Sequence, residues 1–230
     1  MDDRARLAGV LRVLEELGCR ELFLDDLTTE EALALAAGSA PSPADAGNPL
    51  AALEARAEAC QKCGLSGSRT NVVFARGSGT GGLMVVGEAP GGEEDRMGLP
   101  FVGPAGKLLD LLLLTIGFHR GSVYICNVLK CRPPKNRDPR PEEVAACSPY
   151  LRDQLQAVAP RAVLAVGRFA AQMLAGSDAS IGRLRGRVHR HEGVPVVATY
   201  HPAYLLRTPS ATRDAWQDLQ LLKQVLDEPS

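Results

Sequence analysis

The sequence predicts an α/β protein built on a parallel sheet that helices cover on both faces. Four short apolar runs, rich in Val, Ile and Tyr, follow one another after residue 80, and a helical stretch comes after each run. Such runs, alternating with helices, are typical of parallel strands buried on both faces. Ligands of these sheets bind beyond the carboxyl ends of the strands, so we expect function in the loops after residues 89, 129, 168 and 200.

The predicted elements fall into two parts of the chain. The strands are LMVVGEA (83–89), VYICNVL (123–129), AVLAVGR (162–168) and VPVVATY (194–200), and the helices are 105–116, 141–158, 168–175 and 211–226. Upstream, helical spacing predicts helices at 5–18 and 28–37, and a linker rich in Ala, Pro, Ser and Gly covers 37–49. We therefore expect an acidic helical N-terminal extension with its linker (1–50) and one domain large enough to be an enzyme (51–230).

The charge of the chain is distributed unevenly. Over 230 residues, 26 Lys and Arg nearly balance 27 Asp and Glu, but residues 1–55 hold eleven acids and four bases and carry −7. The remainder carries +6, which indicates a basic binding surface beside an acidic arm. We expect the arm either to dock a basic protein partner or to shield the basic surface.

Composition and termini exclude several classes of protein. Hydrophobic residues make up 45% and charged residues 23%, which excludes a disordered chain, a collagen-like repeat and a disulfide-dense mini-protein. Asp2 and Asp3 do not suit a secretory signal, and the longest apolar stretch, 108–116, contains Asp110 and is too short for a bilayer. The expected protein is a cytoplasmic monomer with no membrane contact.

The first predicted strand runs into a Gly-rich acidic loop, Gly87-Glu88-Ala89-Pro90-Gly91, with Glu94 close behind. It lacks the Gly-Lys-Ser/Thr of a phosphate loop, and its acids would repel phosphate. The acids suit holding a water or steadying a cation; a solvated acidic turn is the alternative. Phe101, in the Gly/Pro loop that follows, is a candidate to stack on a planar ligand, with core packing as the alternative.

The second strand ends near Asn127 and enters a Pro-stiffened basic loop. Residues 130–140 hold five bases and one acid, among them Arg132, Lys135 and Arg137. Such a loop suits contacts to backbone phosphates, although a solvated charged loop would look similar. Asn127 offers both a donor and an acceptor, so at a strand end it can read the edge of a base.

The fourth strand ends at His201, followed by Pro202. A histidine fixed at a strand end can donate a hydrogen bond to developing negative charge, whereas a lone histidine is often only structural. Leu205 and Leu206, expected to be exposed, are candidates for a wedge in a base stack. Arg207 follows them, and upstream bases form a further cluster: Arg183, Arg185, Arg187 and Arg190.

Four of the six cysteines form a candidate metal site. Cys60 and Cys63 are separated by two residues, while Cys131 and Cys147 flank the basic loop and a helix start. Because four thiolates in a reducing compartment suit Zn²⁺ or an iron–sulfur cluster, spacing alone leaves the metal open. Cys19 and Cys126 are expected to be buried thiols.

Taken together and in this order, these segments resemble the uracil-DNA glycosylase superfamily, and within it the iron–sulfur branch called family four. The resemblance covers about residues 55–228. It rests on Cys60-x-x-Cys63, GEAPG at 87–91, PFVGPAG at 100–106, NVLKCRPPKNRDP at 127–139, Cys147 and HPAYLLR at 201–207.

The resemblance implies a three-layer α/β/α sandwich with a four-stranded parallel sheet, and removal of uracil from DNA to leave an abasic site. It also implies a [4Fe–4S] cluster, with a structural role, bound by Cys60, Cys63, Cys131 and Cys147. Uracil would lie against Gly87 and Ala89.

The same resemblance implies the roles of the site residues. Phe101 would stack on uracil, Asn127 would pair with its polar edge, and His201 would donate to uracil O2. Glu88 would position the attacking water, with Glu94 as second candidate. Leu205 would fill the emptied stack, and phosphates would contact Arg132, Lys135, Arg137, Arg185 and Arg207.

The chain departs from better-known branches of the superfamily at two positions. Ala89 stands where those branches have Asp, and Gly91 stands where they have a Tyr that excludes thymine. Family four shares both departures. A covalent-trapping branch uses a histidine after the second strand, and residues 130–146 contain none. The main rival is a non-catalytic iron–sulfur module that binds DNA; an α/β hydrolase would need a Gly-x-Ser-x-Gly nucleophile elbow, which is missing.

Overall fold

The computed structural model describes residues 49–228. The acidic extension predicted for residues 1–50 falls outside the described residues except for its last two. Helices predicted at 5–18 and 28–37 are therefore among the parts on which the structure gives no information.

Within residues 49–228, six strands form one sheet in the order β1-β3-β2-β4-β6-β5. Their bounds are β1 (Ala75–Arg76), β2 (Leu83–Gly87), β3 (Tyr124–Asn127), β4 (Ala162–Val166), β5 (Val188–His191) and β6 (Val194–Thr199). The four central strands are parallel and coincide with the four predicted ones. The sheet is wider than predicted, because β1 and β5 add antiparallel edges to β3 and β6.

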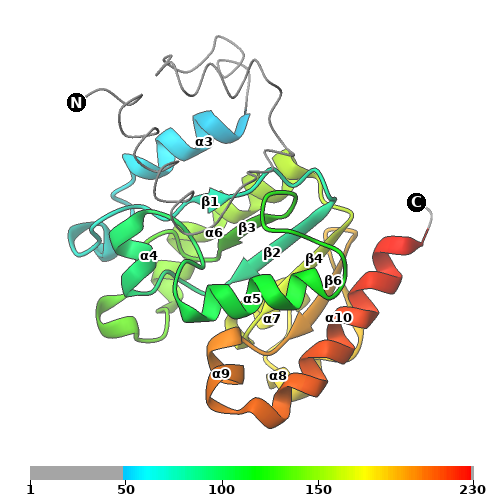
Figure 1. Ribbon diagram of the computed structural model, residues 1–230. Coiled ribbons are helices and arrows are strands. Elements are labelled where there is room, and N and C mark those ends of the chain that lie inside the picture. Colours follow the sequence, from blue (N-terminus) through cyan, green and yellow to red (C-terminus); the bar gives the residue numbers. More distant parts are fainter. Residues whose placement is uncertain (1–48, 229–230) are drawn as a thin grey trace, which may run out of the picture. The chain divides into compact units, whose positions relative to one another are not determined.

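Helices cover both faces of this sheet (Figure 1). Their bounds are α3 (Pro49–Glu58), α4 (Gly92–Met97), α5 (Pro104–Leu114), α6 (Pro141–Val158), α7 (Arg168–Ala175), α8 (Ile181–Leu184), α9 (Pro202–Arg207) and α10 (Thr212–Asp227). Short 3₁₀ turns are η2 (Gly64–Gly67), η3 (Pro134–Asn136) and η4 (Pro209–Ala211). Helices α5 and α10 lie on one face and α6 and α7 on the other, which confirms the α/β/α sandwich.

Burial on both faces explains the uninterrupted apolar strands. Within β2, Leu83 and Val85 belong to the core packed against α5 and α10. Met84 and Val86 point to the opposite face because side chains alternate along a strand, and they are also fully buried. No helix within residues 49–228 combines the length and apolar character that crossing a bilayer requires.

The parallel strands set the position of the site. In Figure 1 the arrowheads of β2 and its neighbours point toward α4, α9 and the loop that follows β3. The chain leaves the sheet there four times, at Gly87, Asn127, Val166 and Thr199. These exits bring together loops that are more than a hundred residues apart in the sequence.

Candidate active site

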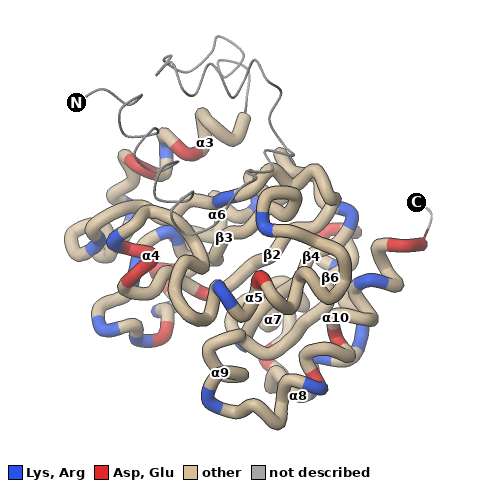
Figure 2. The backbone as a smooth tube through the Cα atoms, viewed as in Figure 1, with Lys and Arg blue, Asp and Glu red and all other residues tan. Residues whose placement is uncertain are grey.

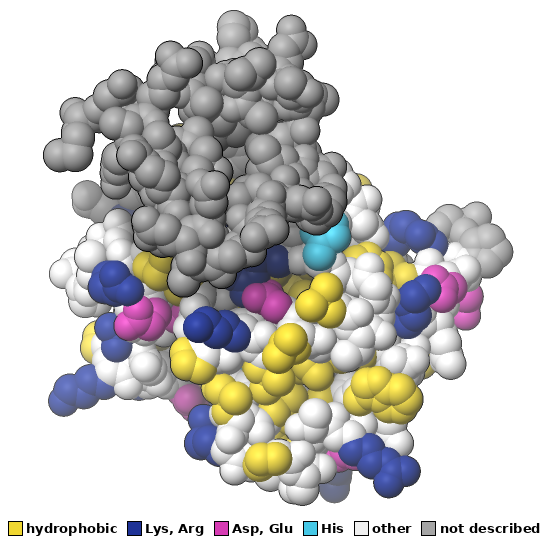
Figure 3. All heavy atoms as spheres, in the orientation of Figure 1, with side chains coloured by type: hydrophobic (Ala, Val, Ile, Leu, Met, Phe, Trp, Pro, Cys, Tyr) yellow, Lys and Arg dark blue, Asp and Glu magenta, His cyan; other side chains and the backbone are white. Residues whose placement is uncertain are grey.

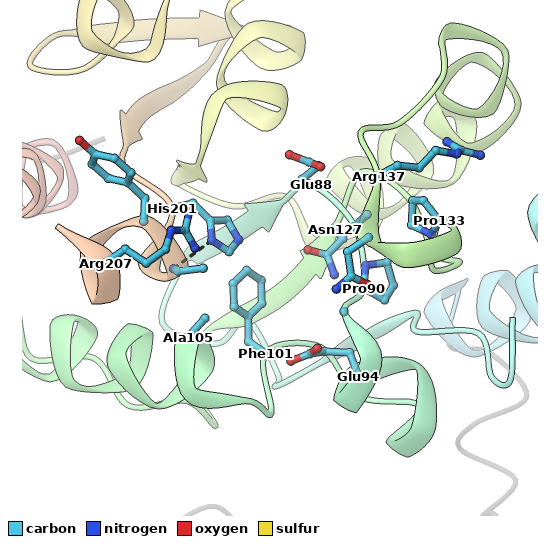
Figure 4. Close-up of a pocket in the computed structure, with 15 residues that line it drawn as sticks. Glu88, Pro90, Glu94, Phe101, Ala105, Asn127, Pro133, Arg137, His201 and Arg207 are labelled. Atoms are coloured by element: carbon cyan, nitrogen blue, oxygen red, sulfur yellow. Dashed lines mark hydrogen bonds between the residues drawn. The ribbon is translucent and has the colours of Figure 1, made fainter.

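A cavity of about 470 Å³ lies at the carboxyl ends of the parallel strands. It is lined by most of the residues predicted for substrate binding and catalysis: Glu88, Ala89, Glu94, Phe101, Asn127 and His201. Figure 4 shows the side chains of Phe101, Asn127 and His201 around one space, with Glu88 at its edge. Because these residues follow three different strands, the fold rather than the chain order assembles the group.

Glu88 is the first residue after β2, and its carboxyl group is partly buried. Its carbonyl oxygen accepts the Leu129 N–H over 3.0 Å, which fixes the backbone of the loop. Burial raises the pKa of the Glu88 carboxyl to about 7; Asp138 raises it further and Arg168 opposes the rise. A carboxyl with such a pKa exchanges a proton near neutral pH, as a group that activates water must.

Asn127 ends β3 and is almost completely buried, with 2% of its surface exposed. Among the described residues, none donates to or accepts from its carboxamide, which faces the cavity. Gly87 lies beneath this side chain: a Cβ added there would approach Asn127 Oδ1 to 2.4 Å and Phe101 Cζ to 2.7 Å. Gly87 therefore shapes the floor of the site, although it is not among the residues that line the cavity.

Phe101 is held from both sides in an uncommon backbone conformation. Its φ of 53° lies in the left-handed region, which costs a residue with a Cβ conformational energy. Arg120 Nη2 donates to the Phe101 carbonyl over 2.8 Å, and Asp110 pairs with the same guanidinium. Glu94 accepts the N–H groups of the next two residues, Val102 and Gly103, each over 3.0 Å.

These hydrogen bonds give Glu94 a structural contact in addition to its predicted role as the second candidate acid. One oxygen of its carboxylate, Oε1, binds two backbone N–H groups and is therefore committed to the Phe101 loop. Glu94 also lines the cavity, and its second oxygen, Oε2, is not used by these two bonds.

His201 is the N-cap residue directly before α9 and is fixed by its own turn. Its Nδ1 accepts the N–H of Ala203, and its ring stacks near that of Phe101, with centroids 5.8 Å apart and planes at 27°. Burial lowers its pKa to about 4; Arg207 lowers it further and Glu94 opposes. Gly167, with a φ of 94°, permits the close approach, because a Cβ there would lie 3.1 Å from the His201 Cβ.

The predicted phosphate-binding residues divide into two groups. Arg137 and Arg207 line the cavity, and Lys135 is exposed on the loop after β3. Arg132 is partly exposed and donates from Nε to Asn136 Oδ1 over 2.8 Å. Figure 2 shows Lys and Arg on this loop and at the end of α9, on the side to which the strands point. Lys135, Arg132 and Arg207 suit contacts with phosphates, whereas the Arg137 guanidinium already pairs with Glu143 through two hydrogen bonds.

Arg185 does not belong to that surface. Its side chain is 15% exposed and pairs with the fully buried Asp218, from Nε to Oδ2 over 3.0 Å. Its guanidinium also lies over the ring of Tyr200, 5.3 Å from the centroid. The predicted phosphate contact is wrong for Arg185, because its donors are already bound within the fold.

The exposed leucine of α9 is Leu206, not Leu205. Leu205 is 2% exposed and belongs to the core packed against α5, so the predicted wedge role is wrong for this residue. Leu206 is 49% and Tyr204 39% exposed. Figure 3 shows apolar side chains gathered over α5, α9 and α10. Tyr204 lines the cavity, and Leu206 is exposed two residues further along α9.

Several residues that shape the site were not predicted. Tyr204 and Asn136 line the cavity, and Arg120 holds Phe101. Asn136 has a φ of 54°, which asparagine tolerates better than most residues. An Asn after two prolines and a lysine is a turn signal that could have singled it out. Arg120 acts through a hydrogen bond to a distant carbonyl, which no local pattern reveals.

The four predicted metal ligands line a second, smaller cavity. Cys60, Cys63, Cys131 and Cys147 surround it, together with Arg69, Lys130 and Tyr150. All four are free thiols. No three His, Cys, Asp or Glu side chains among residues 49–228 converge closely enough to hold a single metal ion. The structure thus brings the four sulfurs to one place without showing what they bind.

The surroundings of these thiols fit an iron–sulfur cluster. Arg69 Nη1 donates to Cys131 Sγ over 3.2 Å, and the Lys130 N–H donates to Cys147 Sγ over 3.3 Å. N–H donors stabilise thiolates, and hydrogen bonds to sulfur are among the features that tune such clusters. Burial raises the pKa of the Cys147 thiol to about 11, so binding a metal there would displace a proton.

Comparisons with known proteins agree with this geometry. Residues 74–220 match the model of the uracil DNA glycosylase superfamily. A type-4 uracil-DNA glycosylase of Archaeoglobus fulgidus is 44% identical over 174 residues, 72% of this chain and 87% of that protein. A type-4 uracil-DNA glycosylase of Thermotoga maritima is 46% identical over 157 residues, which are 67% of this chain and 82% of that protein. A type-5 uracil-DNA glycosylase of Pyrobaculum aerophilum is 40% identical over 142 residues, which are 54% of this chain and 62% of that protein. The chain belongs to the uracil-DNA glycosylase superfamily and groups with its type-4 members.

Proposed function

We propose that this protein hydrolyses the N-glycosidic bond of uracil in single- and double-stranded DNA and leaves an abasic site. The convergence of Glu88, Asn127 and His201 on one cavity, at the ends of three strands, carries the proposal. A non-catalytic iron–sulfur module would need only the basic loop and the cysteines. It would not need an acid with a raised pKa opposite a neutral histidine.

Base recognition uses the walls of the cavity. A base inside a duplex cannot reach this depth, so the uracil nucleotide must be flipped out of the stack. The Phe101 ring then stacks on the base. The free carboxamide of Asn127 donates from Nδ2 to uracil O4 and accepts the N3–H at Oδ1. Cytosine presents the reverse pattern on this edge and is refused by the same orientation.

The reaction exchanges one bond for another. The bond between uracil N1 and sugar C1′ breaks, and its electron pair leaves with uracil. His201 donates from Nε2 to O2 and stabilises the negative charge that grows there. The Glu88 carboxylate orients the attacking water, accepts its proton and favours the cationic sugar as the new C1′–O bond forms.

The rim of the cavity holds the DNA. Lys135, Arg132 and Arg207 contact backbone phosphates. Leu206, with Tyr204 beside it, fills the space that the flipped nucleotide leaves in the stack. This role passes to Leu206 because Leu205 is part of the core.

A cleavage assay tests the proposed activity. The protein is incubated with a single-stranded oligonucleotide that contains one uracil, and alkali then cuts the strand at any abasic site. We expect a single cut at the uracil and none in an oligonucleotide with thymine or cytosine there. DNA binding without a cut would favour the non-catalytic module. Oligonucleotides with hypoxanthine or xanthine extend the same assay to other deaminated bases.

We further propose that Cys60, Cys63, Cys131 and Cys147 hold a [4Fe–4S] cluster. Bound there, the cluster would supply a structural cross-link between the start of the domain and the basic loop, not redox chemistry. Anaerobically purified protein should be brown, with an absorption shoulder at about 400 nm. The Cys147→Ser variant should show a weaker shoulder. A colourless protein that contains zinc would refute the cluster.

We propose that the protein acts as a cytoplasmic monomer and that its acidic arm docks a basic partner or shields the DNA-binding face. The −7 charge of residues 1–55 and the +6 charge of the remainder support the role of the arm. A chain that starts near residue 50 should bind DNA more tightly than the full chain at low salt if the arm shields the domain. Equal affinities across a salt series would leave only the docking role.

A further inference from the structure

Among residues 49–228, Lys130 is the largest fully buried side chain, and neither the proposed chemistry nor DNA binding uses it. It lies three residues after Asn127 and directly before Cys131. A buried lysine is rare, because its ammonium must find partners that replace water. The partners of Lys130 connect two sites that are otherwise separate.

The ammonium group reaches back to the end of β3. Nζ donates to the backbone carbonyl of Asn127 over 2.6 Å and to Gln154 Oε1 over 2.5 Å. It also lies 5.9 Å from the centroid of the Phe74 ring, a cation–π contact. Gln154 is fully buried and donates in turn to Tyr124 Oη over 3.0 Å and to the Phe74 carbonyl.

The backbone of Lys130 reaches the four-cysteine site. Its N–H donates to Cys147 Sγ, and its carbonyl accepts the Val73 N–H over 2.8 Å. Lys130 is also among the residues that line the cysteine cavity. Between Asn127 and Lys130, the N–H groups of Val128 and Leu129 donate to Gly87 and Glu88. Lys130 therefore makes hydrogen bonds to both sites.

We propose that Lys130 is a positioning residue that fixes the Asn127 end of β3 against the four-cysteine site and thereby couples that site to uracil recognition. The inference rests on the proposed function and on the proposed cluster. Asn127 discriminates uracil from cytosine only if its backbone holds the carboxamide in one place. The Lys130 ammonium holds the carbonyl of that same residue, while its N–H holds a cluster ligand.

The first test is a double-mutant cycle between Lys130→Met and Asn127→Ala. Lys130→Met should weaken binding of free uracil, measured by calorimetry, and slow excision by about 10- to 100-fold, as supporting residues commonly do. In the Asn127→Ala background the same change should have less than about a 2-fold effect on excision, because contacting residues are not additive. Losses that multiply, or unchanged uracil affinity, would overturn the proposal.

Gln154→Leu provides a second route to the same answer. It removes one of the two oxygen acceptors of Nζ without changing the loop or β3, so a smaller loss in the same direction is expected. If Lys130→Met does not give soluble protein, this variant in the same cycle decides. Lys107→Met, at an exposed position on α5, is the matched control and should behave as the unchanged protein.

The second test reads the coupling from the cysteine site. A ligand stabilises the state that it binds. Saturating uracil should therefore slow the loss of the cluster absorbance at about 400 nm when an iron chelator is added. We expect this protection in the unchanged protein and in Lys107→Met. In Lys130→Met, saturated at a higher uracil concentration, the protection should be lost. Equal protection in both would contradict the coupling. If the unchanged protein neither binds nor excises uracil, the proposed function itself fails, which is a separate outcome.

Discussion

The backbone N–H of Ala203 donates a hydrogen bond to Nδ1 of His201 over 3.1 Å. A neutral imidazole whose Nδ1 accepts carries its proton on Nε2. Because burial lowers the pKa of His201 to about 4, the ring is neutral near pH 7 and can donate a hydrogen bond from its Nε2–H. His201→Ala, and likewise Asn127→Ala, should slow excision by about 10²- to 10³-fold.

A measurement of DNA affinity separates a specific loss of catalysis in these variants from a general loss of structure. Both variants should bind a uracil-containing oligonucleotide nearly as tightly as the unchanged protein, measured by fluorescence anisotropy. His119→Ala, at an exposed histidine, is the control and should excise at the normal rate. Parallel losses of excision and binding would argue against the assigned roles.

The raised pKa of Glu88 predicts the pH dependence of excision. With a pKa of about 7, the carboxylate fraction rises from about a tenth at pH 6 to about nine-tenths at pH 8. Since the carboxylate is the form that orients water, single-turnover excision should rise over this range and then level off. His201 adds no second limb above about pH 5, because its pKa is near 4.

Glu88→Gln checks the assignment. The variant should be much slower and lose the rise between pH 6 and 8. A retained rise would move the titration to another group. The same group also affects stability: the folded protein holds a proton that the unfolded chain releases, so the free energy of unfolding contributed by Glu88 falls as pH rises from about 4.5 to 7.

Leu205 and Leu206 should give opposite phenotypes. Leu205→Ala removes a core side chain and should lower the free energy of unfolding by about 2–5 kcal/mol, measured by urea denaturation. Leu206→Ala should leave stability unchanged and slow excision from duplex DNA more than from single strands, because only a duplex has a stack to refill. Equal effects on both substrates would exclude Leu206 as the wedge.

A salt series distinguishes exposed from internal bases. Lys135→Ala should weaken DNA binding and reduce the slope of log affinity against log salt by about 1. Arg185→Ala should leave that slope unchanged and lower the free energy of unfolding by about 3–5 kcal/mol, since it strands the buried Asp218. A change of slope in Arg185→Ala would restore its predicted phosphate contact.

The sequence predicted the parts of the fold that have a strong local signal. The four parallel strands are visible because both of their faces are buried, which makes each one an unbroken apolar run. The edge strands have no such signal: β1 contains two residues, and β5 alternates exposed and partly exposed residues in a basic segment. Edge pairing depends on neighbours that are distant in the sequence.

Side-chain roles were harder to predict where they depend on rotation or on a remote partner. Leu205 and Leu206 are adjacent in the sequence, but on a helix successive side chains point in different directions, so one enters the core and the other faces out. Arg185 looks like a surface base until Asp218, 33 residues away, supplies its partner. The positions of Asn127 and His201 at strand ends needed no such information.

The grip on Phe101 has a consequence for how uracil binds. Arg120 and Glu94 set the backbone around this ring when the chain folds, before any base arrives. The entropy lost by ordering the stacking surface is therefore part of the stability of the fold and not of the affinity for DNA. The pocket is preorganised: a flipped base meets a finished surface, and more of its binding free energy remains to offset the cost of leaving the duplex.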